Sequence, residues 1–251
     1  MAIPRVIPVL LLKDEGLVKT VRFRNPKYIG DPLNTVRIFN EKEADELILL
    51  NISSETIPWE LLREIAGECF MPLAYGGGIK TLEDVRSVLK TGIEKVIINS
   101  QLYASKDFLR EAIREFGSSS VVASLDVKKS LVGKYELYSG NGRHNTHLDP
   151  VLFARELEQW GIGEIIVNSV DREGTGKGYD LKLLKEVSAA VSIPVIISGG
   201  AATLEDLVQA IHEGGAAAAA AGSMFVFHGK HRAVLISYPS REELKRVLSK
   251  R

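Results

Sequence analysis

Asp126 is the residue of this chain whose type and position best fit proton-transfer chemistry. It ends an apolar segment, where a carboxyl group can act as a general acid or base; a structural cap on a neighbouring loop is the alternative. The segment Val122–Lys128 around it aligns with Ile7–Lys13, and this alignment places Leu11 opposite Asp126. A duplicated site with one carboxylate per copy would need an aspartate at both places, so Leu11 marks a departure from such a design.

Two glycine-rich turns repeat along the chain in the same way. Pro72–Gly78 leads into Thr81–Asp84, and Pro194–Gly200 leads into Thr203–Asp206. Each repeat is typical of a strand, a turn and a helix start, where free backbone N–H groups and the helix dipole favour an anion. Polar turns also follow the next strand of each half. We therefore predict two phosphate sites, with tight turns alone as the alternative, formed by Gly77, Gly78, Asn99, Ser100, Gly199, Gly200, Gly222 and Ser223.

A third glycine-rich run, Gly174–Gly178, lacks the spacing of a nucleotide-binding loop. We interpret it as a rim loop whose backbone donates to the same ligand at Thr175. Lys19 lies in a long segment after the first strand. There it could bind a phosphate or reach the reacting centre, although an exposed lysine in a basic loop is the alternative.

Four charged residues of balanced sign stand at the opposite ends of the predicted strands: Arg5, Glu46, Lys95 and Glu164. Because side chains alternate along a strand, Arg5 shares a face with Leu11, and Glu164 shares one with Asn168. If those faces line a barrel, the four charges can close its bottom as a salt-bridged ring. Unrelated surface charges are the alternative.

These residues need a scaffold, and the chain alternates short β-branched runs with amphipathic helical patterns throughout. Strands are predicted at 5–12, 45–51, 72–76, 95–99, 120–127, 164–169, 194–198 and 216–221. Eight strand–helix units in 251 residues match a single (β/α)₈ barrel domain over 1–251, built from two homologous half-barrels. Segment 130–146 is predicted to form a hairpin inserted after the fifth strand. An open doubly wound sheet is the alternative fold.

Composition narrows the range of partners. Lys plus Arg and Asp plus Glu both number 32, so no overall field attracts nucleic acid or a membrane. Apolar runs of about seven residues are too short to span a bilayer, and a cytoplasmic location is expected. Cys69, the single cysteine, is interpreted as a buried structural thiol in the apolar run before a strand. The five histidines lack metal-ligand spacing, and we expect neither a metal nor another cofactor.

Taken together, these motifs resemble the HisF family, the cyclase subunit of imidazole glycerol phosphate synthase in histidine biosynthesis, from about Arg5 to Phe225. The resemblance implies a barrel that receives ammonia from a HisH-like glutaminase at its N-terminal face. It implies that this ammonia reacts at the other face with a bisphosphorylated substrate. By the same resemblance the four charges form the ammonia gate, the polar turns bind the substrate phosphates, and Asp126 and Lys19 are catalytic.

Leu11 stands where that family has its other catalytic aspartate, and general acid–base action typically contributes about 10²- to 10⁴-fold to a rate. Asn51 and Glu173 also replace aspartates. The run Val9–Asp14 is similar to the paralogous branch associated with acetamidino sugars of lipopolysaccharide and other surface polysaccharides. That resemblance predicts a relay of ammonia to a third enzyme, which amidates a nucleotide sugar. A genuine cyclase and a non-catalytic phosphosugar-binding barrel are the alternatives.

Overall fold

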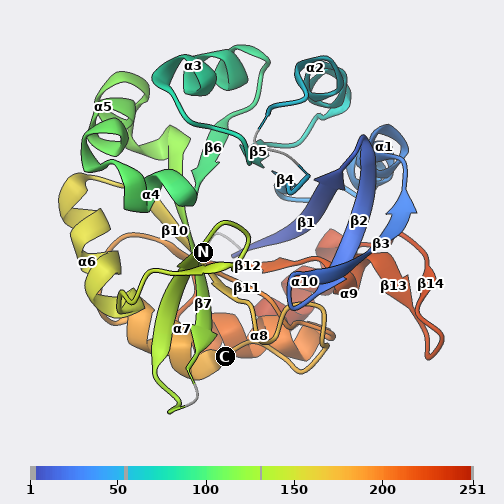
Figure 1. Ribbon diagram of the computed structural model, residues 1–251. Coiled ribbons are helices and arrows are strands. Elements are labelled where there is room, and N and C mark those ends of the chain that lie inside the picture. Colours follow the sequence, from blue (N-terminus) through green and yellow to red (C-terminus); the bar gives the residue numbers. More distant parts are fainter. Residues whose placement is uncertain (1–3, 54–55, 131, 250–251) are drawn as a thin grey trace.

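Parallel strands form the centre of the molecule and close on themselves, as the computed structural model of residues 4–53, 56–130 and 132–249 shows (Figure 1). The hydrogen-bonded order is β10-β11-β12-β1-β4-β5-β6-β7, and a further pairing of β7 with β10 closes the barrel. The predicted (β/α)₈ fold is confirmed. Its strands are β1 (Arg5–Lys13), β4 (Leu47–Asn51), β5 (Leu73–Gly76), β6 (Lys95–Ile98), β7 (Val121–Lys129), β10 (Glu164–Ser169), β11 (Val195–Ser198) and β12 (Ala218–Ala221).

Helices surround the strands (Figure 1). In the repeated halves, the same capping box opens α3 and α8: the threonine hydroxyl accepts from the backbone of the third helical residue, whose aspartate accepts from the cap. The helices are α1 (Pro32–Glu41), α2 (Trp59–Glu68), α3 (Leu82–Lys90), α4 (Ser100–Ala104), α5 (Lys106–Phe116), the 3₁₀ turn η1 (Ser118–Ser120), α6 (Pro150–Trp160), α7 (Leu181–Ser188), α8 (Leu204–His212), α9 (Ser223–Val226) and α10 (Arg241–Leu248). In the part of the chain described, no helix has the length and apolar character to cross a membrane.

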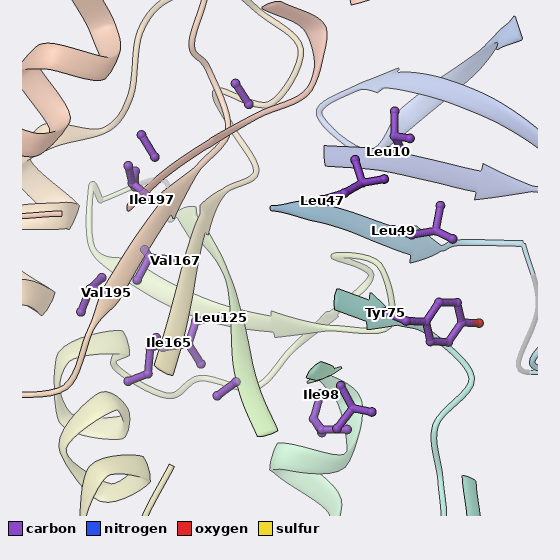
Figure 2. Close-up of a cluster of buried hydrophobic side chains, with 14 of the residues drawn as sticks. Leu10, Leu47, Leu49, Tyr75, Ile98, Leu125, Ile165, Val167, Val195 and Ile197 are labelled. Atoms are coloured by element: carbon purple, nitrogen blue, oxygen red, sulfur yellow. The ribbon is translucent and has the colours of Figure 1, made fainter. Parts of the chain in front are cut away.

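Two apolar layers follow from the alternation of side chains along each strand. The outward side chains pack against the helices, and Figure 2 shows part of this layer, with Leu10, Tyr75 and Leu125 among its labelled residues. The inward side chains form a separate cluster inside the barrel that includes Ile7, Leu11 and Ile166. The barrel interior is therefore packed, and most of its polar residues occur at the two ends.

Two hairpins extend from the C-terminal ends of barrel strands, and a third follows a helix. The predicted insertion after the fifth strand is confirmed: β8 (Tyr135–Ser139) pairs antiparallel with β7 and with β9 (His144–Asn145). The segment expected to be a basic loop after the first strand is instead mostly a hairpin, β2 (Gly16–Val21) and β3 (Arg24–Gly30), which pairs with β1. A third hairpin, β13 (Phe227–His228) and β14 (Ala233–Val234), follows α9.

Candidate functional site

The four charged residues at the strand starts meet at the N-terminal end of the barrel; we call them the charged ring (Arg5, Glu46, Lys95 and Glu164). Arg5 donates to both carboxylates, and Lys95 Nζ lies 3.0 Å from Glu46 Oε1 and 3.0 Å from Glu164 Oε2. The carboxylate side chains are only 3% and 10% exposed. Each cation therefore bridges both anions, and the ring closes across β1, β4, β6 and β10.

The ionisation of Arg5 fits this ring. Burial lowers its pKa, but hydrogen bonds and charge attraction from Glu164 and Glu46 outweigh that effect, so the net shift of the Arg5 pKa is upward. The arginine thus stays charged. Above the ring, most inward side chains are apolar, among them Ala74, Ala218 and Ala220, and the buried Ser124 is a polar one at the level of Ile166.

Asp126 lies at the other end of the barrel interior and is 7% exposed. Asn168 Nδ2 donates to its Oδ1 at 3.1 Å, and Asn99 Nδ2 lies 3.3 Å from its Oδ2. Burial raises the pKa of Asp126 to about 7, and the bond from Asn168 opposes part of this rise. A carboxyl group that titrates near neutrality can give or take a proton, which general acid–base catalysis requires.

Leu11 faces the same interior and is 8% exposed. It pairs with Leu50 of β4 on one side and with Val18 of β2 on the other. The position opposite Asp126 in the duplicated pattern is therefore filled by an apolar side chain among apolar neighbours. Strand β1 supplies no second carboxyl group at this level.

Lys19 is buried on β2, contrary to the alternative of an exposed loop lysine. Its Nζ donates to Val9 O at 2.6 Å, and a Cβ placed on Gly222 would lie 1.9 Å from Nζ. Burial lowers the pKa of Lys19 to about 8, and attraction to Glu173 opposes this. The ammonium group thus lies directly beside the turn between β12 and α9, which is one of the turns predicted to bind phosphate.

The glycines of the predicted phosphate turns adopt backbone conformations that other residues rarely take. Gly77 and Gly200 have φ values of +109° and +114°, and in both a Cβ would lie 2.2 Å from a backbone oxygen. This requirement alone also fits a tight turn without a ligand. Ser223 adds a further observation, because its Oγ is buried and has no hydrogen-bond partner in the described part of the chain.

The remaining predicted residues lie in the same region. Gly78 and Gly199 also have positive φ, and Asn99 and Ser100 join β6 to α4. Thr175 does not fit its predicted role, because its N–H and its hydroxyl both donate to Arg172 O, at 3.0 and 2.6 Å. The rim loop is thus held by its own hydrogen bonds, and neither of the two Thr175 donors remains for a ligand.

Two residues at the mouth were not among the predicted site residues. Asn168 binds Asp126, and strand parity had already placed it on the inner face of β10. Glu173 is partly buried in the rim loop, where burial raises its pKa and Lys19 opposes the rise. No cluster of three or more metal-ligating side chains occurs among residues 4–53, 56–130 and 132–249.

Fold and site together define a (β/α)₈ barrel with a charged ring at one end. At its other end lies a buried carboxyl group whose pKa is raised to about 7. Residues 5–232 match the family model described as histidine biosynthesis protein. A Pseudomonas aeruginosa protein provisionally named imidazole glycerol phosphate synthase subunit hisF2 is 50% identical over 244 residues, covering 96% of this chain and 97% of the relative. An Alkaliphilus metalliredigens imidazole glycerol phosphate synthase subunit HisF is 41% identical, covering 91% and 92%. This chain belongs to the HisF family of imidazole glycerol phosphate synthase subunits.

Proposed function

We propose that this chain is the synthase subunit of a glutamine amidotransferase that conducts ammonia without completing the cyclase reaction. A partner glutaminase supplies ammonia at the N-terminal face, and the barrel passes it to the C-terminal face. The observation that carries the proposal is the contrast between the two ends: the charged ring is complete, whereas Leu11 stands where the mouth would need a second carboxyl group.

The charged ring suits a gate for a small neutral molecule. It holds two positive and two negative side chains in mutual contact, so its net charge is zero. Arg5 is the most exposed member, with 32% of its side chain accessible. A partner that binds this face can reach Arg5 and weaken its contacts, which opens the way to the apolar interior.

A cleft beside the ring supports the proposal of a partner at this face. A cleft of about 380 Å³ is lined by Asn40, Glu43, Ala44, Asp45, Phe70, Met71, Pro72 and Arg241. Asp45 precedes Glu46 of the ring in the chain, and its Oδ2 accepts from Val6 N at 3.0 Å. Phe70 at this cleft is 85% exposed. An exposed aromatic ring bordered by polar groups is typical of an anchor for another protein.

We propose further that the ammonia serves a third enzyme that amidates a nucleotide sugar for surface polysaccharides. The lost acid–base pair and the similarity of Val9–Asp14 to that paralogous branch support this destination. The second candidate is the family's cyclisation itself. It is favoured by Asp126, whose pKa of about 7 suits proton transfer, and by Lys19 beside the Gly222–Ser223 turn.

The first test is whether the cognate glutaminase hydrolyses glutamine faster when mixed with this chain. We expect stimulation, and we expect Phe70→Asp to weaken it by reducing the affinity of the complex. Leu152→Asp is the matched control, because Leu152 is also an exposed apolar residue (60%) but lies on α6, away from this cleft. The proposal is refuted if the unmodified chain neither forms a complex with the glutaminase nor stimulates it.

A further inference from the structure

Two of the hairpins meet at an aromatic ring on the rim of the barrel. The ring belongs to Phe227 of β13, and cations from both hairpins lie over it. Lys27 Nζ of β3 lies 5.7 Å from the ring centroid, and the guanidinium carbon of Arg232 lies 4.5 Å from it. Figure 1 shows β3 and β13 on the same side of the molecule. The hairpins β2–β3 and β13–β14 therefore form one continuous surface.

Exposed apolar side chains border these cations. Val21 at the end of β2 is 44% exposed, and Val234, which pairs with Phe227 across β13 and β14, is 43% exposed. Gly174 of the rim loop lies between the two hairpins. A Cβ on Gly174 would lie 3.1 Å from Val21 Cα, and its carbonyl oxygen lies 3.4 Å from Arg232 Nη1. We call this set the hairpin patch (Val21, Lys27, Phe227, Arg232 and Val234).

The two hairpins carry positive side chains and no negative ones. The sequence has no acidic residue between Glu15 and Asp31, or between Glu213 and Glu242. Within 16–30 and 227–234 the exposed basic residues are Arg22, Arg24, Lys27, Lys230 and Arg232. Because the chain as a whole has no net charge, this excess is local. A partner that matches it must present carboxylates.

The hairpin patch lies next to the end of the barrel at which ammonia would leave. Lys19 and Lys27 are cross-strand partners on β2 and β3, so they share a face of this hairpin. Lys19 Nζ lies beside the Gly222 turn, and the chain runs from this turn through α9 directly into β13. An enzyme that takes ammonia from the mouth without losing it to water must cover this rim.

We propose that the hairpin patch binds an acidic protein surface, namely that of the enzyme that receives the ammonia. Carboxylates of this partner pair with Lys27 and Arg232, and its apolar side chains cover Val21 and Val234. A small anion would match the charge but leave both valines in water, so the patch fits a protein better. The identity of the partner rests on the proposed function, whereas the chemistry of the patch does not.

The test measures the dissociation constant between the complete chain and the purified enzyme that amidates the nucleotide sugar in the same organism, at low and at high sodium chloride. We expect a complex that weakens as the salt concentration rises. The double variant Lys27→Glu/Arg232→Glu places like charges opposite the partner's carboxylates, and it should raise the dissociation constant at least about a hundredfold. Val234→Asp should raise it about tenfold, because it puts a carboxylate into an apolar contact.

Lys182→Glu/Arg246→Glu is the matched control. It reverses the same two kinds of charge on α7 and α10, where the two side chains are 74% and 70% exposed. This variant should bind the enzyme as tightly as the unmodified chain does. The hairpin-patch variants should still stimulate the glutaminase, because its proposed binding face is at the other end of the barrel.

The patch is overturned if the unmodified chain does not bind the enzyme, or if the patch variants bind it as tightly as the unmodified chain or the control. Undiminished enzyme binding together with lost binding of UDP, the small-anion probe, would identify a small-anion site instead. Stimulation of the glutaminase with undiminished enzyme binding in the patch variants would reject the patch alone. Weakened enzyme binding in these variants, without any stimulation by the unmodified chain, would support the patch and reject the proposed conduction.

Discussion

Replacing Leu11 by aspartate gives β1 a carboxyl group at the position where its counterpart β7 has Asp126. Leu11 is 8% exposed and faces the barrel interior beside Leu50 and Val18. A general acid or base typically contributes about 10²- to 10⁴-fold to a rate. If the remaining mouth is competent, Leu11→Asp should therefore raise ammonium-driven cyclisation of the family's bisphosphorylated substrate by at least about a hundredfold.

The same replacement carries a cost in stability. Loss of a buried leucine removes about 1.5–3 kcal/mol of hydrophobic stabilisation. The new carboxyl group must also be buried, and it can stay protonated to limit this penalty. Because domains are typically stable by about 5–15 kcal/mol, the variant should remain folded, with a lower midpoint in urea that checks the substitution.

Turnover with saturating ammonium chloride measures the reaction at the mouth of the barrel alone, because no glutaminase is needed to supply ammonia. Leu11→Asn is the control, because the asparagine side chain is as large and polar as aspartate but does not gain or lose a proton near neutral pH. Two results would refute our interpretation of Leu11. The first is a turnover rate of the unmodified chain within about tenfold of the Leu11→Asp rate. The second is a Leu11→Asn rate equal to the Leu11→Asp rate.

Three further predictions follow from the charged ring and the mouth. Lys95→Met leaves two buried carboxylates with one cation, and because Lys95 is 19% exposed we expect a loss of about 1–3 kcal/mol in urea unfolding. The pKa of Asp126 is raised in the fold from 3.8 to about 7, so its contribution to stability is complete below pH 4 and is lost as pH rises to 7. Asp126→Asn should therefore remove a pH-dependent loss of up to about 4 kcal/mol, measured by urea unfolding across this pH window. Ser223→Ala removes a buried hydroxyl without a partner, and it should raise stability by about 1 kcal/mol while weakening inorganic phosphate binding about tenfold in calorimetry.

The barrel and the charged ring could be predicted because both depend on strand periodicity. Residues two apart on a strand face the same side, so Arg5 and Glu164 had to share the interior with Leu11 and Asn168 once the strands closed. The repeated Thr-x-x-Asp signal likewise located the starts of α3 and α8, where both capping boxes form. These features follow from the local sequence and from the closing of the strands into a barrel.

Other features of the site could not be predicted from the sequence, because individual contacts decide them. Lys19 lies among basic residues typical of a loop, yet pairing of β2 with β1 buries it and directs its Nζ to Val9 O. The β-branched residues Val18, Thr20 and Val21 were the available signal for this strand. Thr175 was expected to face a ligand, but a turn within its own loop takes its donors.

The distance between the two ends bears on the proposal that ammonia conduction is kept while the cyclase reaction is lost. Arg5 and Leu11 lie six residues apart on β1, which corresponds to about 20 Å. Substitutions more than about 7–10 Å apart without shared partners act nearly independently on stability. Leu11 packs against apolar neighbours at the mouth, whereas ion pairs among its own four members hold the ring. A carboxyl group can thus be replaced by leucine at the mouth while the ring stays closed, which is what the proposed separation of conduction from proton transfer requires.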